Sequence, residues 1–563
     1  MFEQTLEGSR ELPLKVLDMG LGQERVAWFS QGTPNMYEAT FPYVLSKLRE
    51  KTNIELDLEL YNKFSQYSAY LNIDEVDDMD KAWGRVAQEL NMDIVELEKK
   101  IMPMAGLYSI AEHARTLLFA INDGKLPSNV GGGYNLRVIF RRAISFIDQF
   151  NWDIEIADVC DWHADELREL FPEVSEHLDE LRQILNVEKE KYYQTKKNAG
   201  KIVKNEIKKG EISEKTLLTL YDSNGINPDI VVEEAKKLGV EVRIPDDFYS
   251  RVVALHEKKE QVYATQKELD IDLSNIPETQ SLYFDNYEDY SNKAKVLKII
   301  DKYVILDKSV AYPTSGGQLH DIGTISGEKF SNVIKEGKYV IHVMDKPPKF
   351  KEGDTVDIIV DKNWRKQIAQ HHTTTHIINA ATREVLGAHI NQAGAKKSQE
   401  KAHLDVTHFN AISDEDLKKI EALSNEIVKK NLKTNLSFMP RSEAEKKYGM
   451  SIYQGGAVPG KLIRIVEIPD LEVEACGGTH LNRTGEAGEI KILKSQKIQD
   501  GIVRITFTAG EATKKLKQTY QNIIQELEDV LHVSASQIPA RVQELIKKWK
   551  STMKTSQHSS NFS

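Results

Sequence analysis

The chain has 563 residues, with 75 lysines and arginines against 86 aspartates and glutamates, and a formal net charge of -11. No apolar run approaches the roughly 20 residues that cross a bilayer, the first residues lack a secretory signal, and the negative charge argues against non-specific coating of nucleic acid. We therefore expect no membrane partner and roughly three to five domains. The two cysteines, Cys160 and Cys476, are too few for a disulfide framework and fit a cytoplasmic protein.

The first 50 residues contain a glycine-rich turn between a short apolar strand, 15–17, and a predicted helix. Gly20 and Gly22 form the turn, and Arg25 follows it. Because the N-terminus of a helix attracts phosphate and a guanidinium group binds it through two hydrogen bonds, the turn is a candidate nucleotide site. Many strand-to-helix junctions share this pattern, so a purely structural turn is the alternative.

Residues 51–265 have apolar positions at helical spacing and few turn residues, which predicts a helical region. Within it a loop rich in Gly, Pro and Asn, 124–133, precedes a helix with Arg137 and Arg141 on one face. Such a loop and arginine face suit contacts with an RNA backbone. The alternative is that the arginines pair with carboxylates on the protein surface.

From about residue 266 the pattern changes to short apolar runs separated by turns, which predicts a small antiparallel β-barrel at 266–361. Residues 362–510 begin with helical spacing and end with strands, which predicts an α/β core. Residues 511–563 are predicted to form a helical arm with a polar, disordered tail at 551–563.

Two histidine-containing pairs lie in the predicted α/β core. His372 and His376 are four residues apart, which places them on one face of a helix. Cys476 and His480 are also four apart, but the glycines between them predict a turn that folds both side chains toward one point. Three imidazoles and a thiolate make a typical zinc set. The alternatives are a solvated helix surface for the first pair and a turn beside a buried thiol for the second.

The sequences HTTTH and, about a hundred residues later, CGGTH resemble the editing domain of alanyl-tRNA synthetases and the free-standing deacylases related to it. The resemblance implies that Zn²⁺ is held by His372, His376, Cys476 and His480. It also implies a substrate, tRNA(Ala) wrongly charged with serine or glycine, whose ester bond is hydrolysed. Four protein ligands are typical of structural zinc, whereas catalytic zinc keeps a position open, and the sequence leaves both roles available.

The sequence DMGLGQER in the first 50 residues resembles motif 3 of class II aminoacyl-tRNA synthetases in its alanyl form. The resemblance implies that Arg25 contacts the phosphate of ATP and that Asp18 holds the ammonium group of alanine, with Gly20 and Gly22 in the turn between them. ATP and Mg²⁺ are then cofactors of the complete ligase, and alanine is its substrate.

The loop and helix at 124–142 resemble the region with which these enzymes recognise tRNA. The resemblance implies that Asn129 and Asp222 read a G·U wobble pair in the acceptor stem of tRNA(Ala), with Arg137 and Arg141 beside them. An amide and a carboxylate are suitable partners for exocyclic amino groups and wobble-exposed base edges.

The stretches YPTSGGQ and HINQAG resemble parts of the editing pocket, which implies pocket roles for Gln318 and Gln392. Thr373, within HTTTH, is a third candidate because its hydroxyl can bond the hydroxyl of a seryl group. Helical threonines also bond their own backbone, which is the alternative for Thr373.

These observations predict a multidomain α+β protein. Its parts are a remnant of the class II aminoacylation core at 1–50, a helical tRNA-recognition region at 51–265, a β-barrel-like part of the editing module at 266–361, a zinc-binding editing core at 362–510, and a helical arm and disordered tail at 511–563. The resemblance is to an archaeal-type alanyl-tRNA synthetase that lacks most of the N-terminal aminoacylation core and the C-terminal dimerisation domain.

This reading predicts a chain that binds tRNA and edits but does not activate alanine by itself, with a separate chain supplying motifs 1 and 2. One alternative is an autonomous deacylase for Ser-tRNA and Gly-tRNA. The other is a non-catalytic, zinc-stapled RNA-binding partner of a separate catalytic half.

Overall fold

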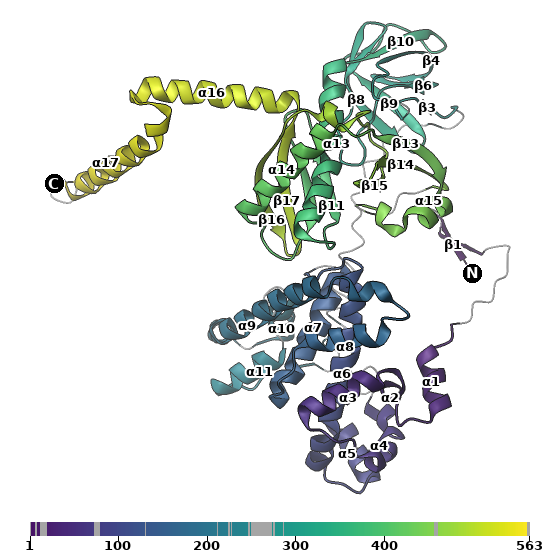
Figure 1. Ribbon diagram of the computed structural model, residues 1–563, viewed down its shortest axis with the longest axis vertical. Coiled ribbons are helices and arrows are strands. Elements are labelled where there is room, and N and C mark those ends of the chain that lie inside the picture. Colours follow the sequence, from purple (N-terminus) through teal and green to yellow (C-terminus); the bar gives the residue numbers. More distant parts are fainter. Residues whose placement is uncertain are drawn as a thin grey trace. The chain divides into compact units, whose positions relative to one another are not determined.

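The computed structural model describes residues 2–5, 8–11, 20–71, 79–129, 131–210, 212–222, 226, 228–245, 248, 251, 273, 276–284, 286–454, 456 and 460–559. The chain divides into two compact units, Met1–Tyr263 (unit 1) and Ala264–Ser563 (unit 2). We describe each unit by itself, and Figure 1 labels the elements of both. The strand predicted at 15–17 lies outside the described residues.

Unit 1 is helical after a short N-terminal hairpin, as Figure 1 shows. Its elements are β1 (Phe2–Thr5), β2 (Gly8–Glu11), α1 (Gln23–Gln31), α2 (Met36–Thr40), α3 (Pro42–Thr52), α4 (Leu58–Ser65), α5 (Met79–Glu89), α6 (Ile94–Asn122), α7 (Gly131–Phe150), α8 (Ile156–Leu167), α9 (Leu178–Lys209), α10 (Glu214–Asp222) and α11 (Pro228–Lys237).

The longest apolar helix of unit 1 is α6, and its neighbours α7 and α8 pack against it. Asp93 begins α6 by accepting hydrogen bonds from the backbone N–H groups of Val95 and Glu96. Apolar residues surround α6 on nearly every side, as expected for a helix in the middle of a core. A Cβ atom on Gly106 would lie 3.1 Å from the indole of Trp152, so the glycine lets this ring pack closely against the helix.

Unit 2 begins with the predicted antiparallel barrel, which is confirmed. Its strands close in the order β10-β4-β5-β9-β8-β7. The elements are β3 (Gln280–Ser281), β4 (Ser291–Ile300), β5 (Tyr303–Leu306), β6 (Lys308–Ser309), β7 (Gly323–Ile325), β8 (Glu328–Glu336), β9 (Tyr339–Met344) and β10 (Thr355–Val360). The burial of β10 alternates residue by residue, so one face of this strand fills the barrel and the other meets solvent.

The α/β core of unit 2 is built around one buried helix, α13 (Lys362–Leu386), which packs against α14, β11, β12 and β17. Its sheets are ordered β11-β12-β17-β16 and β13-β14-β15. The remaining elements are β11 (Gln392–Lys397), β12 (Ala402–Thr407), α14 (Asp414–Lys430), β13 (Asn435–Pro440), α15 (Arg441–Tyr448), β14 (Leu462–Ile468), β15 (Glu472–Ala475), β16 (Ile490–Gln499) and β17 (Ile502–Ala509).

A buried ion pair joins α13 to the barrel. Arg365, on the first turns of α13, donates from Nε to both carboxylate oxygens of Asp321 at 3.0 and 2.9 Å, and a terminal nitrogen also donates to the carbonyl of Val310 at 2.6 Å. Both side chains of the pair are at most 1% exposed. Because a buried guanidinium needs its acceptors, these contacts fix where α13 begins relative to the barrel strands.

The last two helices are α16 (Glu511–Leu531) and α17 (Ile538–Ser559). The tail predicted to be disordered at 551–563 is helical as far as Ser559, where α17 ends, and residues 560–563 lie outside the described residues. Its last residues contain lysine, methionine and glutamine but neither glycine nor proline, so the helix has no local reason to stop. Among the described residues, no helix is long and apolar enough to cross a membrane.

Candidate functional site

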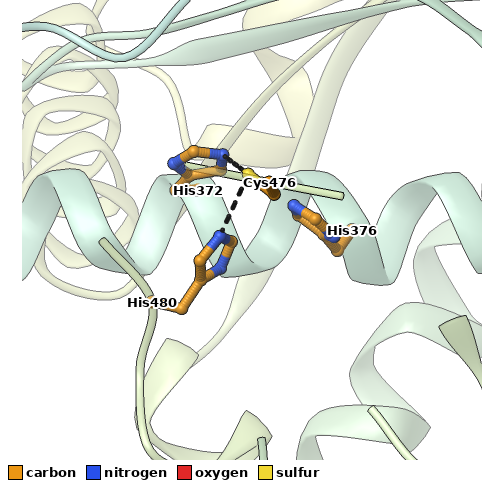
Figure 2. Close-up of side chains that lie close together, drawn as sticks. All are labelled: His372, His376, Cys476 and His480. Atoms are coloured by element: carbon orange, nitrogen blue, oxygen red, sulfur yellow. Dashed lines mark hydrogen bonds between the residues drawn. The ribbon is translucent and has the colours of Figure 1, made fainter. Parts of the chain in front are cut away.

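The four predicted metal ligands converge in unit 2. His372 and His376 come from α13, and Cys476 and His480 come from the loop after β15. Their ligand atoms all lie within 4.8 Å of one another. The sulfur of Cys476 is 3.3 Å from Nε2 of His372 and 3.4 Å from Nε2 of His480, and Figure 2 shows the four side chains pointing toward one centre. The two remote sequence pairs therefore form one cluster.

The loop after β15 approaches α13 so closely that one of its positions, 478, has room only for glycine. A Cβ atom on Gly478 would lie 1.9 Å from Cε1 of His372 and 2.8 Å from Oε1 of Gln318. No side chain fits in that space. Arg464 supports the same loop from the other side, since one of its terminal nitrogens donates to the carbonyls of Cys476 and Gly478 at 2.9 and 2.8 Å.

Each of the three imidazoles has a polar neighbour at its Nδ1 atom. Nδ1 of His372 lies 2.6 Å from Oε1 of Gln318, and Nδ1 of His480 lies 3.3 Å from the hydroxyl of Thr373. Nδ1 of His376 lies 3.4 Å from a carboxylate oxygen of Glu474. Such outer partners orient imidazole ligands and set which nitrogen faces a metal.

The protonation of the cluster suits metal binding. Burial is the largest cause that lowers the pKa values of His372 and His480 well below the usual value, so both rings are neutral near pH 7. For Cys476, burial raises the pKa, but the hydrogen bond and charge of His376 oppose it and the net shift is downward. Neutral imidazoles and a thiolate are the forms that bind metals.

A cavity of about 710 Å³ opens beside the cluster. Its wall includes His372, His376, Gln392, Lys397, Glu474 and Cys476. A volume of roughly 300–1,000 Å³ is typical of small-molecule sites. The predicted pocket residue Gln392 therefore lies on the wall.

The structure places Gln318 and Thr373 behind the histidines rather than on this wall. The side-chain amide of Gln318 donates to the hydroxyl of Thr479 and accepts from the backbone N–H of Thr479, both at 2.9 Å. These bonds connect the loop between β6 and β7, which carries Gln318, to the CGGTH turn. Thr373 accepts from the backbone N–H of Leu481 at 3.0 Å. Both side chains thus support ligands, because their polar atoms are already used.

The sequence analysis did not single out Glu472, Glu474, Lys397 or Arg464. Glu472 and Glu474 are buried on β15, and burial is the largest cause that raises the pKa of Glu474 to about 7 and that of Glu472 to about 8. The one available signal was an acidic residue at every second position just before the cysteine, in EVEAC. Nothing local marked the lysine or the arginine, whose burial depends on distant segments.

In unit 1, the two predicted RNA-contacting arginines lie against the buried Glu188. Arg137 donates to its carboxylate at 2.6 and 2.8 Å and is only 5% exposed, and Arg141 lies 3.5 Å from the same group. Arg137 also donates to the side-chain carbonyl of Asn129, which is exposed at the loop tip. Arg137 therefore orients Asn129. Asp222 ends α10, and its side chain is not among those described.

The predicted nucleotide turn is described only in part. Gly22 precedes α1 and accepts from the backbone N–H groups of Arg25 and Val26 at 3.1 and 3.2 Å. The side chain of Arg25 is exposed on the first turn of α1, and Gly20 lies in the segment before this helix. Asp18 lies outside the described residues.

Comparisons with known proteins identify the family of the chain. A family model described as "tRNA synthetases class II (A)" matches residues 1–364, and the "Threonyl and Alanyl tRNA synthetase second additional domain" matches residues 463–506. The chain belongs to the class II (A) tRNA synthetase family.

Similar curated proteins carry the name alanine--tRNA ligase. The chain is 40% identical to the one from Methanocella arvoryzae, 39% to one from Methanococcus maripaludis strain C5, and 38% to the one from Pyrococcus abyssi. These alignments cover 98, 97 and 98% of the chain, respectively, and 62% of each relative. The chain thus spans about 62% of the length of these relatives.

The class II match corrects one prediction. The sequence motifs predict only a remnant of the class II core at residues 1–50, but the family model covers residues 1–364. The motif 3 sequence was one recognisable stretch of a longer signature, which continues through the helices of unit 1 and the barrel. The comparisons also give no support to a separate chain that supplies motifs 1 and 2.

Proposed function

We propose that the cavity of unit 2 hydrolyses tRNA(Ala) that has been wrongly charged with serine or glycine, in a cytoplasmic protein of alanyl-tRNA synthesis. Attachment of alanine to tRNA(Ala), with ATP and Mg²⁺, is the activity we propose for the whole protein. The observation that carries the editing proposal is the convergence of four ligand side chains beside a cavity large enough for an aminoacyl-adenosine.

The metal we propose is Zn²⁺, held by His372, His376, Cys476 and His480. The donor set supports this choice, because imidazoles and a thiolate are ligands that zinc prefers, and their atoms lie close enough to share one ion. Bound there, the ion would supply Lewis acidity to an ester carbonyl. The chain's own residues hold the rings in place: Gln318 orients His372, and Thr373 orients His480.

A hydrolytic site is needed because a synthetic pocket discriminates poorly between similar amino acids. One missing methyl group or one added hydroxyl changes binding by only about 1–3 kcal/mol in such a pocket. A second site that removes serine and glycine multiplies the selectivity. The polar wall, with Gln392 and Glu474, suits a seryl hydroxyl and an α-ammonium group.

For tRNA recognition we propose the acceptor stem as partner, read at a G·U pair by Asn129 and Asp222. Support comes from Asn129, whose amide is exposed at a loop tip and oriented by Arg137. Because the side-chain carbonyl of Asn129 accepts from Arg137, we assign its NH₂ group the role of donor to base edges. Arg141 supports this arrangement through Glu188.

The experiment incubates the purified chain with tRNA(Ala) charged with serine, glycine or alanine and measures deacylation. Serine and glycine should be released and alanine retained, and a zinc chelator should stop the reaction until Zn²⁺ is restored. Binding of tRNA(Ala) with no release of serine or glycine would overturn the editing proposal and support a zinc-stapled RNA-binding protein instead.

A further inference from the structure

The wall of the unit 2 cavity contains a buried cation that the proposed function has not used. Lys397 is the last residue of β11 and is 2% exposed. Its Nζ donates to the carbonyl of Gly316 at 3.2 Å. Among the described residues, no carboxylate forms an ion pair with it, although lysine is rarely buried without one.

The backbone around Lys397 is held firmly. Its N–H donates to the carbonyl of Gly317 at 2.7 Å, and its carbonyl accepts from the N–H of Leu319 at 3.1 Å. Gly317 has a φ of +73°, and a Cβ atom there would lie 1.9 Å from the carbonyl oxygen of Ala395. The backbone of Lys397 is therefore held in place against the loop that contains Gly316 and Gly317.

The environment of Lys397 combines burial with negatively charged neighbours. Burial is the largest cause that lowers the pKa of Lys397, and the nearby charges of Cys476 and Glu474 act against it. An ammonium has three N–H donors, and Gly316 accepts one. The other donors need acceptors, because an unsatisfied buried donor is costly. A ligand that brings oxygen atoms into the cavity would supply them.

We propose that Lys397 donates a hydrogen bond from Nζ to the carbonyl oxygen of the aminoacyl ester and stabilises the negative charge that forms there during hydrolysis. This inference rests on the proposed editing function. The α-ammonium of the amino acid is excluded as the partner because it carries the same charge. The phosphates of tRNA are excluded because Lys397 is only 2% exposed and interacts electrostatically with Cys476 of the cluster.

The chemical step is balanced without any further reactant. The oxygen of water bonds to the acyl carbon, and the electron pair of the carbonyl double bond moves to the oxygen that Lys397 holds. The double bond re-forms as the bond to the ribose oxygen breaks. One proton of the water passes to that ribose oxygen, and the amino acid leaves as its carboxylic acid, which ionises in solvent. Because the oxyanion exists only at the transition state, Lys397 raises kcat more than it lowers KM.

The test compares Lys397→Met with Lys396→Met, its exposed neighbour on the same strand. Hydrolysis of Ser-tRNA(Ala) should lose roughly 100- to 1,000-fold in kcat for Lys397→Met, with KM within about twofold and zinc content unchanged. Lys396→Met should match the unaltered chain, and Lys397→Arg should recover part of the loss because it keeps the charge. A Lys397→Met variant with zinc bound and kcat within threefold of the unaltered chain overturns the inference.

A second measurement uses the unaltered chain and does not depend on how a variant folds. A crystal with 3′-seryl-amino-3′-deoxyadenosine, whose amide resists hydrolysis, should place Nζ of Lys397 about 2.6–3.2 Å from the amide carbonyl oxygen. A bound analogue whose carbonyl points away from Lys397 overturns the inference. Absence of any deacylation by the unaltered chain overturns the proposed function together with this role, whereas deacylation that survives Lys397→Met overturns only this role.

Discussion

Single residues decide the geometry of the proposed zinc site, because each of its histidines lies against a polar neighbour. Gln318 lies against His372, Thr373 against His480, and Glu474 against His376. None of these three is adjacent in sequence to the ligand it orients: Thr373 follows His372 but lies against His480. Motifs alone therefore identify the ligands but not the contacts that make them effective.

Replacing His376 by Ala leaves three ligands and should reduce zinc affinity by more than the ~10–100-fold that loss of an outer partner costs. Deacylation of Ser-tRNA(Ala) should be abolished. Zinc content by atomic absorption and release of labelled serine measure the two effects. His177→Ala is the control, because His177 is exposed at the start of α9 and its side chain makes no capping hydrogen bond. Unchanged deacylation by His376→Ala would contradict the metal-dependent mechanism.

Gly478→Ala should displace the imidazole of His372, since the new Cβ would lie 1.9 Å from it. We expect zinc affinity to fall about 10- to 100-fold, as when an imidazole ligand loses its orientation. Gly477→Ala is a matched control one residue earlier, where the nearest atom to a new Cβ is 3.9 Å away on Phe284. Equal zinc affinity in the two variants would show that the close approach is unimportant.

Glu472→Gln tests a buried acid whose pKa is raised to about 8, chiefly by burial and the charge of Glu474. The unfolded chain releases this proton near the ordinary value of 4.5. The folded state therefore holds more protons between these values, so its stability falls as pH rises through them. Denaturant unfolding should show the variant gaining stability relative to the original chain from about pH 5 to pH 8. A pH-independent difference would contradict the raised pKa.

At the scale of elements, the position of α13 explains both the success and the limits of prediction. Its helical spacing and the His372–His376 pair were visible in the sequence. Its nearly complete burial was not, because the sheets that cover it come from residues 392–509. The same holds for Lys397 and Arg464, which local polarity would place at the surface. The barrel was predicted because turns and alternating residues are local signals.

Arg365→Met should leave Asp321 buried without its partner and destabilise unit 2 by about 3–5 kcal/mol. The pair Arg504–Asp405 is a matched control: it is also bidentate, at 2.7 and 2.8 Å, but its arginine is about one-third exposed. Arg504→Met should therefore cost roughly 1 kcal/mol or less. Chemical denaturation of both variants measures the difference, and similar losses would show that burial of the Arg365 pair does not matter.

At the scale of the whole molecule, the proposed functions assign separate tasks to the two units. The candidate tRNA-reading residue Asn129 lies in unit 1, and the four candidate metal ligands with their cavity lie in unit 2. Each unit has its own buried core, as expected of parts that fold separately. Chemistry and recognition should therefore be separable by experiment.

Unit 2 expressed alone, as residues 264–563, should bind one Zn²⁺ per chain and hydrolyse Ser-tRNA(Ala) with nearly the same kcat. Its KM should rise at least about tenfold, because loss of base contacts from unit 1 removes about 1.4 kcal/mol or more of binding. The isolated unit should treat G·U and G·C acceptor stems alike, while the full chain prefers G·U. Retained preference in the isolated unit would contradict this division of tasks.

The contrast between the two thiols has a consequence for oxidative damage. Cys160 is fully buried and its pKa is raised by that burial, so it reacts poorly with peroxide or alkylating agents. Cys476 lines the open cavity, and its pKa is lowered. Conversion of that one sulfur to a sulfenic or sulfinic acid would remove a metal ligand and leave tRNA reading in unit 1 intact. Under the proposed function, the protein in a stressed cell would keep selecting its tRNA while serine and glycine passed uncorrected into alanine codons.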